Sequence, residues 1–379
     1  MIQPSPDHPS LTRRNWLVLT AAAVSGCGGV GAAVALLPGT GGTGVFALGA
    51  IAGFGSVIVS GIKFDDRSAS VQMDGVSASA SQLRLGMVAS VQGERSADPT
   101  LGVASSVEVW SIAQGLVSQS SSGQFTVAGM TLQTDGATLV SGINSVASIV
   151  PGLRVAVWGL PSGASSWLAT RVAVVEDLTL VSTGVLAMVA SQRSVNGWML
   201  SGSAADGLSA GQLVRVQGTA AGMGNAMLIS SVKVLDQGSA ALPQGEVEIE
   251  GVVTNVASAS AFTLGGLSVE TTGAIVSPPG AQITLGDRVE VHGMWLGGVL
   301  KASRVEIENQ QTLQLAEISG LIEVFNGLGD FVVRGQRCNA LSASIKNGAA
   351  ANLKVGVKVK VEGQASGNVL MVTELYFLG

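Results

Sequence analysis

The sequence predicts an all-β protein built from tandem small barrels, and two observations carry this prediction. At five places a glycine is followed seven residues later by a second glycine. Apolar residues usually fill the third and fifth positions between them, which is typical of a strand with one buried face. The pairs are Gly86/Gly93, Gly152/Gly159, Gly211/Gly218, Gly286/Gly293 and Gly356/Gly363. We therefore expect five copies of one unit.

Each unit has the same order of elements. It opens with a glycine before two apolar residues, continues with an aromatic strand, and turns through a two-residue hairpin ending in glycine, which supplies the positive φ such turns need. A third strand, a short helical link, the glycine-framed strand and a closing strand follow. This is the order of an OB-type barrel, and a Greek-key sandwich is the competing architecture. In the second unit the five strands are expected around residues 115–117, 125–127, 130–132, 152–159 and 172–174.

The third unit is shorter than the others. Only eight residues separate Gly202 from Gly211, so we predict that this unit lacks the third strand or the helical link. Units of roughly 60 to 75 residues bury only a marginal core of their own, and the links are short, so neighbouring barrels should pack together. The barrels are expected at 46–112, 113–178, 179–238 (truncated), 245–310 and 314–379, after a signal peptide at 1–26 and a Gly-rich tether at 27–45.

The N-terminal segment predicts export. Arg13 and Arg14 precede an uncharged run, which resembles a twin-arginine signal, and the residues before Cys27 (Val-Ser-Gly) resemble a bacterial lipobox in which the cysteine thiol receives the lipid. Two alternatives remain: a signal peptide cleaved after Ala35, and an uncut span over 16–37, since roughly 20 residues cross a bilayer. By resemblance to known lipoproteins, an Asp after the lipidated cysteine would favour retention in the inner membrane. Gly28 stands there instead, so we expect sorting to the outer membrane, facing the periplasm or the cell surface.

These features, with the tether motif at 39–44 and the opening at 53–65, resemble a bacterial family of exported lipoproteins made of tandem small OB-like β-barrels. The repeated domain of that family is a domain of unknown function. The resemblance covers the whole chain and implies a lipid-anchored protein of the cell envelope. It implies no catalytic residues, because the family has none assigned.

Titratable residues are few, and we predict no enzyme, no catalytic residue, no metal site and no cofactor. His292 is the single histidine beyond the signal, and it occupies a column that holds unrelated residues in the other units, so we expect it to face solvent. Glu246, Glu248 and Glu250 alternate along one strand and are expected on a solvated face. Cys338 is expected to be a small buried hydrophobe without a disulfide partner.

Three tryptophans are the candidate ligand residues. Trp158, Trp167 and Trp295 lie beside the hairpin that joins the last two strands of their units, where an exposed aromatic face would suit a sugar or a protein partner. Packing between neighbouring barrels is the alternative explanation. OB-type barrels often bind nucleic acid, but 20 Lys and Arg against 25 Asp and Glu do not favour a phosphate partner.

We therefore predict an exported protein, held at the membrane through a lipid anchor, that serves as a non-enzymatic structural or interaction scaffold. A carbohydrate- or cell-wall-binding module is the alternative, argued from the tryptophans. A nucleic-acid binder is the second alternative, argued from the OB-like topology.

Overall fold

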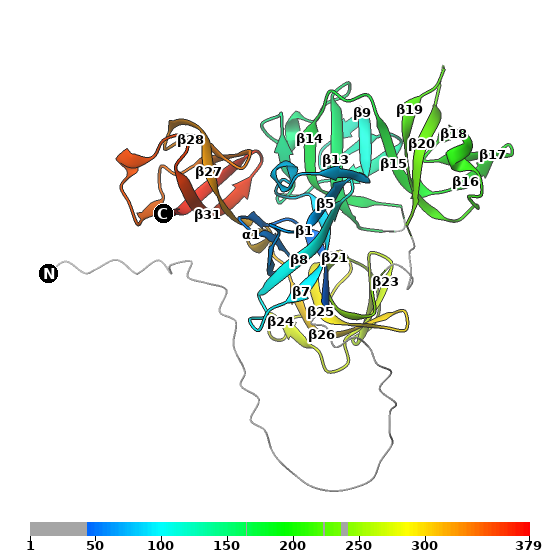
Figure 1. The fold of residues 1–379 in the computed structure, drawn as a ribbon. Coiled ribbons are helices and arrows are strands. Elements are labelled where there is room, and N and C mark those ends of the chain that lie inside the picture. Colours follow the sequence, from blue (N-terminus) through cyan, green and yellow to red (C-terminus); the bar gives the residue numbers. More distant parts are fainter. Residues whose placement is uncertain (1–43, 164, 223, 236–241) are drawn as a thin grey trace, which may run out of the picture. The chain divides into compact units, whose positions relative to one another are not determined.

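The computed structural model describes residues 44–379 except 164, 223 and 236–241 (Figure 1). These residues form five tandem small β-barrels, which confirms the predicted all-β fold. No described helix is long and apolar enough to cross a membrane. Arg13, Arg14 and Cys27 lie outside the described residues.

The second repeat illustrates how each barrel closes. Its first strand pairs antiparallel with the second strand and with the fourth, the third strand pairs parallel with the fifth, and the fifth pairs antiparallel with the fourth. This order closes the sheet into a barrel of the OB type. The alternative of a Greek-key sandwich is therefore wrong. The first three strands are β9 (Ala113–Ser121), β10 (Gln124–Val127) and β11 (Met130–Gln133), and the fourth and fifth are β13 (Arg154–Pro161) and β14 (Trp167–Val174). An additional short strand, β12 (Leu139–Ser141), lies between the third and the fourth and pairs parallel with β14.

The fourth and fifth repeats have the same strand pairing. The fourth consists of β21 (Gly245–Ser258), β22 (Ala261–Leu264), β23 (Leu267–Glu270), β24 (Ile275–Ser277), β25 (Arg288–Leu296) and β26 (Val299–Ile307). A short helix, α1 (Gln310–Leu313), leads to the fifth, which consists of β27 (Leu315–Gly327), β28 (Asp330–Val333), β29 (Gln336–Asn339), β30 (Ser344–Lys346), β31 (Lys358–Ser366) and β32 (Val369–Phe377).

The first repeat divides its opening strand. Its strands are β1 (Gly44–Ala50), β2 (Gly53–Phe54), β3 (Val57–Val59), β4 (Ile62–Asp65), β5 (Ser70–Met73), β6 (Val76–Ala78), β7 (Val88–Arg95) and β8 (Leu101–Val109). Single 3-10 turns form the helical link in the first, second and fifth repeats, at Ala80–Gln82, Val146–Ser148 and Ala350–Asn352.

The two glycines of each pair have different structural roles. The first has a φ between +77° and +90° in all five repeats, a conformation that side chains with a Cβ rarely adopt. The second lies at a β-bulge, where the register of the fourth strand shifts against the fifth. A Cβ at this second glycine would lie only 2.1 to 2.3 Å from a carbonyl oxygen of the fifth strand.

The third repeat differs from the prediction. It consists of β15 (Leu180–Val185), β16 (Ala187–Val189), β17 (Gln192–Val195), β18 (Trp198–Ser201), β19 (Leu213–Ala220) and β20 (Ala226–Val234). Its third strand, β18, is present and pairs parallel with β20, and a 3-10 turn follows at Ser203–Ala205. Among the described residues of 180–234, this repeat lacks instead the short strand that the other repeats place between the third strand and the fourth.

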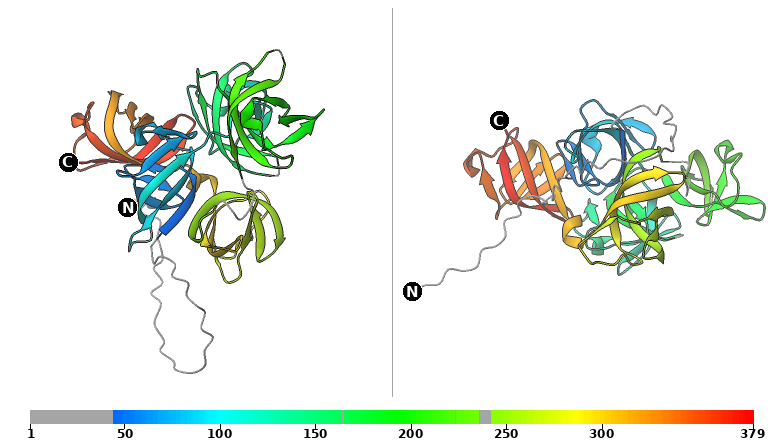
Figure 2. Two further views of the ribbon diagram at one scale, coloured as in Figure 1. Left: turned by 45° about the vertical axis from the view of Figure 1, so that its right-hand side comes forward. Right: turned by 90° about the horizontal axis from the view of Figure 1, so that it is seen from below.

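The repeats share sheets, and their partners are not always neighbours in sequence. Strand β1 pairs parallel with β21 of the fourth repeat, and β2 pairs parallel with β27 of the fifth. The second and third repeats meet where β9 pairs with β15. The repeats can be followed by colour in Figure 2, from blue for the first to red for the fifth.

Candidate functional site

The most unusual cluster of ionisable groups lies on the outer face of the fourth barrel. Val247 and Ile249 of β21 point into the barrel core, so Glu248 between them points outward. On the neighbouring strand β25, Glu290 and His292 also point outward, and His292 lies directly opposite Glu248 in the strand register. The alternation of two adjacent strands therefore brings the three side chains together.

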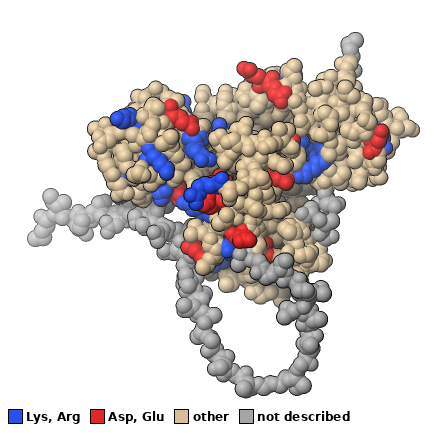
Figure 3. Space-filling model, viewed as in Figure 1, with Lys and Arg blue, Asp and Glu red and all other residues tan. Residues whose placement is uncertain are grey.

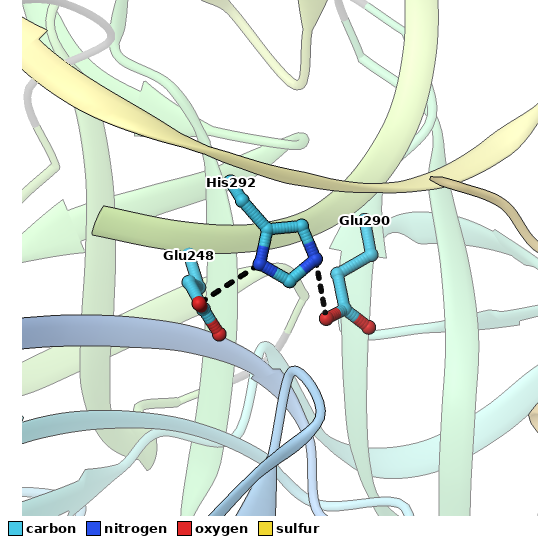
Figure 4. Close-up of side chains that lie close together, drawn as sticks. All are labelled: Glu248, Glu290 and His292. Carbon is cyan, nitrogen blue, oxygen red and sulfur yellow. Dashed lines mark ion pairs between the residues drawn. The ribbon is translucent and has the colours of Figure 1, made fainter. Parts of the chain in front are cut away.

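His292 lies between the two carboxylates (Figure 4). Its Nδ1 is 2.8 Å from Oε1 of Glu248, and its Nε2 is 3.1 Å from Oε1 of Glu290. The same Glu248 oxygen accepts a hydrogen bond from Nη2 of Arg95, which comes from β7 of the first repeat. Nη1 of Arg95 lies 3.2 Å from Glu246. The cluster thus spans the contact between two repeats.

Burial makes these charges depend on one another. The side chain of Glu248 is 3% exposed and that of His292 is 14% exposed. Burial by itself would lower the pKa of His292, but the hydrogen bonds and charges of Glu248 and Glu290 outweigh it and raise this pKa to about 10. His292 is therefore an imidazolium at neutral pH, with each ring nitrogen facing a carboxylate.

The same three residues offer ligand atoms within 4.8 Å of one another, the spacing of a metal site. The arrangement suits a charge bridge better. The two carboxylates face opposite nitrogens of one ring, whereas a metal binds only one of these nitrogens.

A second buried ion pair lies beside the cluster. Arg288 of β25 donates from Nε to Glu250 Oε1 at 2.6 Å. The other oxygen of Glu250 accepts the backbone N–H of Ala50, in the first repeat, at 2.8 Å. Glu250 therefore joins a cation of its own barrel to the backbone of another.

These positions correct two expectations. His292 does not face solvent, and Glu248 and Glu250 are buried, not on a solvated face. The sheet continues from β21 into β1 and β7 of the first repeat, so Arg95 reaches Glu248 and the backbone N–H of Ala50 reaches Glu250. His292 in turn lies against Glu248 and Glu290. Glu246, at the margin, is partly exposed. The sequence of the fourth repeat alone does not indicate these partners from the first repeat.

The tryptophans do not form the predicted exposed face. Trp295 is fully buried in the core of the fourth barrel, and Trp167 is buried in the core of the second. Trp158 points out of its own barrel but is 6% exposed, because it packs in a cluster shared with the first repeat. The alternative of packing between barrels therefore holds for Trp158. Cys338 is buried as predicted, and burial raises the pKa of its thiol to about 12.

Basic and acidic side chains are intermixed on the face drawn in Figure 3. Opposite charges also pair within single repeats, as Arg304 does with Glu306 and Arg337 with Asp330. Lysines cluster only loosely on β31 and the segment before it.

A family model described as a domain of unknown function (DUF5666) matches residues 114–173, 250–306 and 319–374, together less than half of the chain. These segments correspond to the second, fourth and fifth barrels. No curated protein and no solved structure shows significant similarity to the chain. Three of the five barrels are thus similar to a domain of unknown function.

Proposed function

We propose that this chain is an exported, lipid-anchored scaffold of the cell envelope, in which the first repeat holds the other four together. One observation carries the scaffold proposal. Polar or charged side chains link the first repeat to each of the other four repeats. The contact between the first and fourth repeats, formed by Arg95, Glu248 and Glu250, is one of four such contacts.

The contact with the third repeat centres on Arg215. This side chain is 2% exposed, and its Nη2 lies 2.7 Å from Oδ1 of Asp74 at the tip of the β5–β6 hairpin. Its Nε donates to the carbonyl oxygen of Ser111 at 2.7 Å. The cations of Arg215 and Lys233 lie over the ring of Trp110, at 5.1 and 3.8 Å from its centroid. A buried cation of the third repeat is thus neutralised by the first repeat.

The contact with the second repeat uses backbone acceptors. Thr170 donates to the carbonyl oxygen of Gly86 at 2.7 Å, and Arg171 donates to that of Leu85 at 3.0 Å. Both donors are on β14. Burial lowers the pKa of Arg171 to about 10, and the nearby charge of Arg84 adds to this shift. These bonds satisfy carbonyls in the turn before β7.

The contact with the fifth repeat combines strand pairing with an ion pair. Lys63 of β4 binds Glu317 of β27, beside the parallel pairing of β2 with β27. Arg334 donates to the carbonyl oxygen of Ala80 at 3.2 Å and lies over the ring of Phe54 at 5.3 Å. The core cluster of the first repeat continues into that of the fifth.

Buried ion pairs add little net stability, but losing one partner costs about 3 to 5 kcal/mol, so they favour one arrangement of the barrels over others. A fixed arrangement is what a scaffold needs. The carbohydrate alternative loses its basis, because the three tryptophans on which it depended are buried.

The anchor is tested by substituting Cys27→Ala and measuring how the protein divides between membrane and soluble fractions. A diacylglyceryl group adds about 0.8 kcal/mol of membrane binding per buried methylene, so we expect its loss to release the protein. Cys338→Ala is the matched control, because it removes the other cysteine and should leave the fractionation unchanged. If the Cys27→Ala protein stays in the membrane fraction after a salt wash, the lipid anchor is wrong.

A further inference from the structure

Among its described residues, the third repeat has no counterpart of one short strand that the other four repeats contain. In the other four repeats a short strand pairs parallel with the closing strand. The central residue of each short strand lies beside an inward-facing apolar residue of the closing strand. These pairs are Val71 with Val107, Val140 with Val172, Val276 with Val305, and Ile345 with Leu375.

The corresponding residue of the third repeat is Val232 on β20. It pairs with Val216 of β19, as Val172 pairs with Val157 and Val305 with Val291 in their own repeats. Within 180–234, leaving aside the undescribed residue 223, no strand occupies the position beside Val232. Strand β18 pairs with β20 only as far as Leu228. The 3-10 turn Ser203–Ala205 packs against β20 and shares its core cluster with Val232, but it forms no strand pairing there.

The burial of Val232 shows the effect of this gap. Val107, Val172, Val305 and Leu375 are all 0% exposed, whereas Val232 is only partly buried. Ser230 and Ser231, next to it, are exposed. An edge of this kind presents backbone N–H and C=O groups that another strand can pair with. We call the edge of β20 along Ser231–Lys233 the open slot.

We propose that the open slot binds an extended segment of a partner protein, added parallel to β20, with a Val or Ile beside Val232 and an acidic residue beside Lys233. Strand addition of this kind gains affinity from main-chain hydrogen bonds and specificity from alternate side chains. The inference rests on the proposed scaffold role and names how a partner would attach. Its test requires no membrane, so it can fail independently of the anchor.

The four short strands of the chain itself define the apolar part of this partner. Each places a β-branched aliphatic residue at the centre of the pairing, and each places a polar residue directly after it in the segment that pairs with the closing strand: Gln72, Ser141, Ser277 and Lys346. A segment with the same pattern would complete the third barrel.

The charge next to the slot defines the polar part. The residue after the central apolar position of the closing strand is Glu108 in the first repeat and Glu306 in the fourth, but Lys233 in the third. Lys233 lies 3.5 Å from Glu108 and 3.8 Å from the ring centroid of Trp110, and its side chain is 38% exposed. A carboxylate on an added strand would lie beside this ammonium, where a lysine would be repelled.

The experiment uses the purified full chain and a fluorescent peptide that copies residues 68–74 with Gln72→Glu. We expect saturable binding, and we expect Val232→Lys to weaken it at least about tenfold, which is about 1.4 kcal/mol. Leu228→Lys is the matched control: it is an exposed apolar residue on the same strand, but β18 already pairs beside it, so binding should persist. A second peptide with Val71→Asp should not bind.

Hydrogen exchange of the unsubstituted chain provides a readout that no folding defect affects. Residues 229–234 should exchange faster than residues 169–174 of the second repeat, and adding the peptide should slow them. Equal binding by Val232→Lys and the unsubstituted chain would overturn the proposal.

Exchange at 229–234 that is slow without peptide would also overturn it. If deleting residues 28–43 made that exchange fast, the chain's own N-terminal segment would fill the slot. If dilution made it fast, a second copy would do so.

Discussion

His292 is the residue with the most specific chemical environment. A buried imidazolium loses hydration, and here two carboxylates, each facing one ring nitrogen, compensate for that loss. Arg95 from the first repeat then shares the Glu248 oxygen, so the charge of His292 affects the contact between two barrels. Its protonation state is therefore part of what holds the fourth repeat in place.

This coupling predicts a specific dependence of stability on pH. The folded pKa of His292 is raised to about 10, above its ordinary 6.5. Its contribution to the free energy of unfolding is therefore fully present below pH 6.5 and is lost as pH rises toward 10. Denaturant unfolding followed between these limits should show a fall in stability that is absent from His292→Gln, which should already be less stable at pH 6.5. Equal slopes for both proteins would contradict the assignment.

The position of His292 was predictable, but its environment was not. The alternation of β25 places it on the outward face next to the bulge glycine, as the sequence pattern indicates. The arginine that binds its carboxylate partner comes from a strand 153 residues away in the chain. Trp158 occupies the same column in the second repeat and is likewise covered by the first repeat. Periodicity identifies the face of a strand that points outward, and does not identify what covers it.

At the scale of elements, the paired glycines explain why this repeat is recognisable. The first glycine makes the turn into the fourth strand at positive φ, and the second lets the fourth strand pass close to the fifth at a bulge. Each role excludes a side chain for a different reason. The spacing of seven residues is the length of strand between the turn and the bulge.

These roles predict unequal costs of substitution within one pair. A Cβ at Gly293 would lie 2.2 Å from the carbonyl oxygen of Lys301, whereas a Cβ at Gly286 meets nothing within 4 Å. We expect Gly293→Ala to lower the free energy of unfolding by more than about 3 kcal/mol, because backbone must move. Gly286→Asn should cost less than about 1 kcal/mol, because asparagine tolerates positive φ. Denaturant titration measures both, and a larger loss in Gly286→Asn would reverse the assigned roles.

The sequence pattern did not identify which element the third repeat lacks. The short interval between Gly202 and Gly211 correctly indicates a missing element, but the third strand and the 3-10 turn are both retained. In the second, fourth and fifth repeats the short strand pairs only with the closing strand, whereas β18 of the third repeat pairs with both β17 and β20. Barrel closure therefore requires β18 and does not require the short strand. The length of the interval shows that residues are missing. It does not show which strand the barrel can lose and still close.

At the scale of the whole chain, the five repeats do not pack simply in sequence order. The first repeat binds the second through backbone acceptors, the third through Arg215, and the fourth and fifth through parallel strand pairing. Short links indicate that neighbours touch. They give no information on the pairing of β1 with β21, whose residues are about 200 positions apart. Only the folded chain reveals the first repeat as the common partner.

Hydrogen exchange after disruption of a single barrel tests this claim most directly. Val91 of the first repeat and Val216 of the third occupy the same position of the motif, and both are 0% exposed. We expect Val91→Asp to speed exchange in 246–249 of β21 and 315–318 of β27, although neither segment is altered. Val216→Asp should leave both segments protected. If Val91→Asp speeds exchange only within 44–109, the first repeat does not hold the others together.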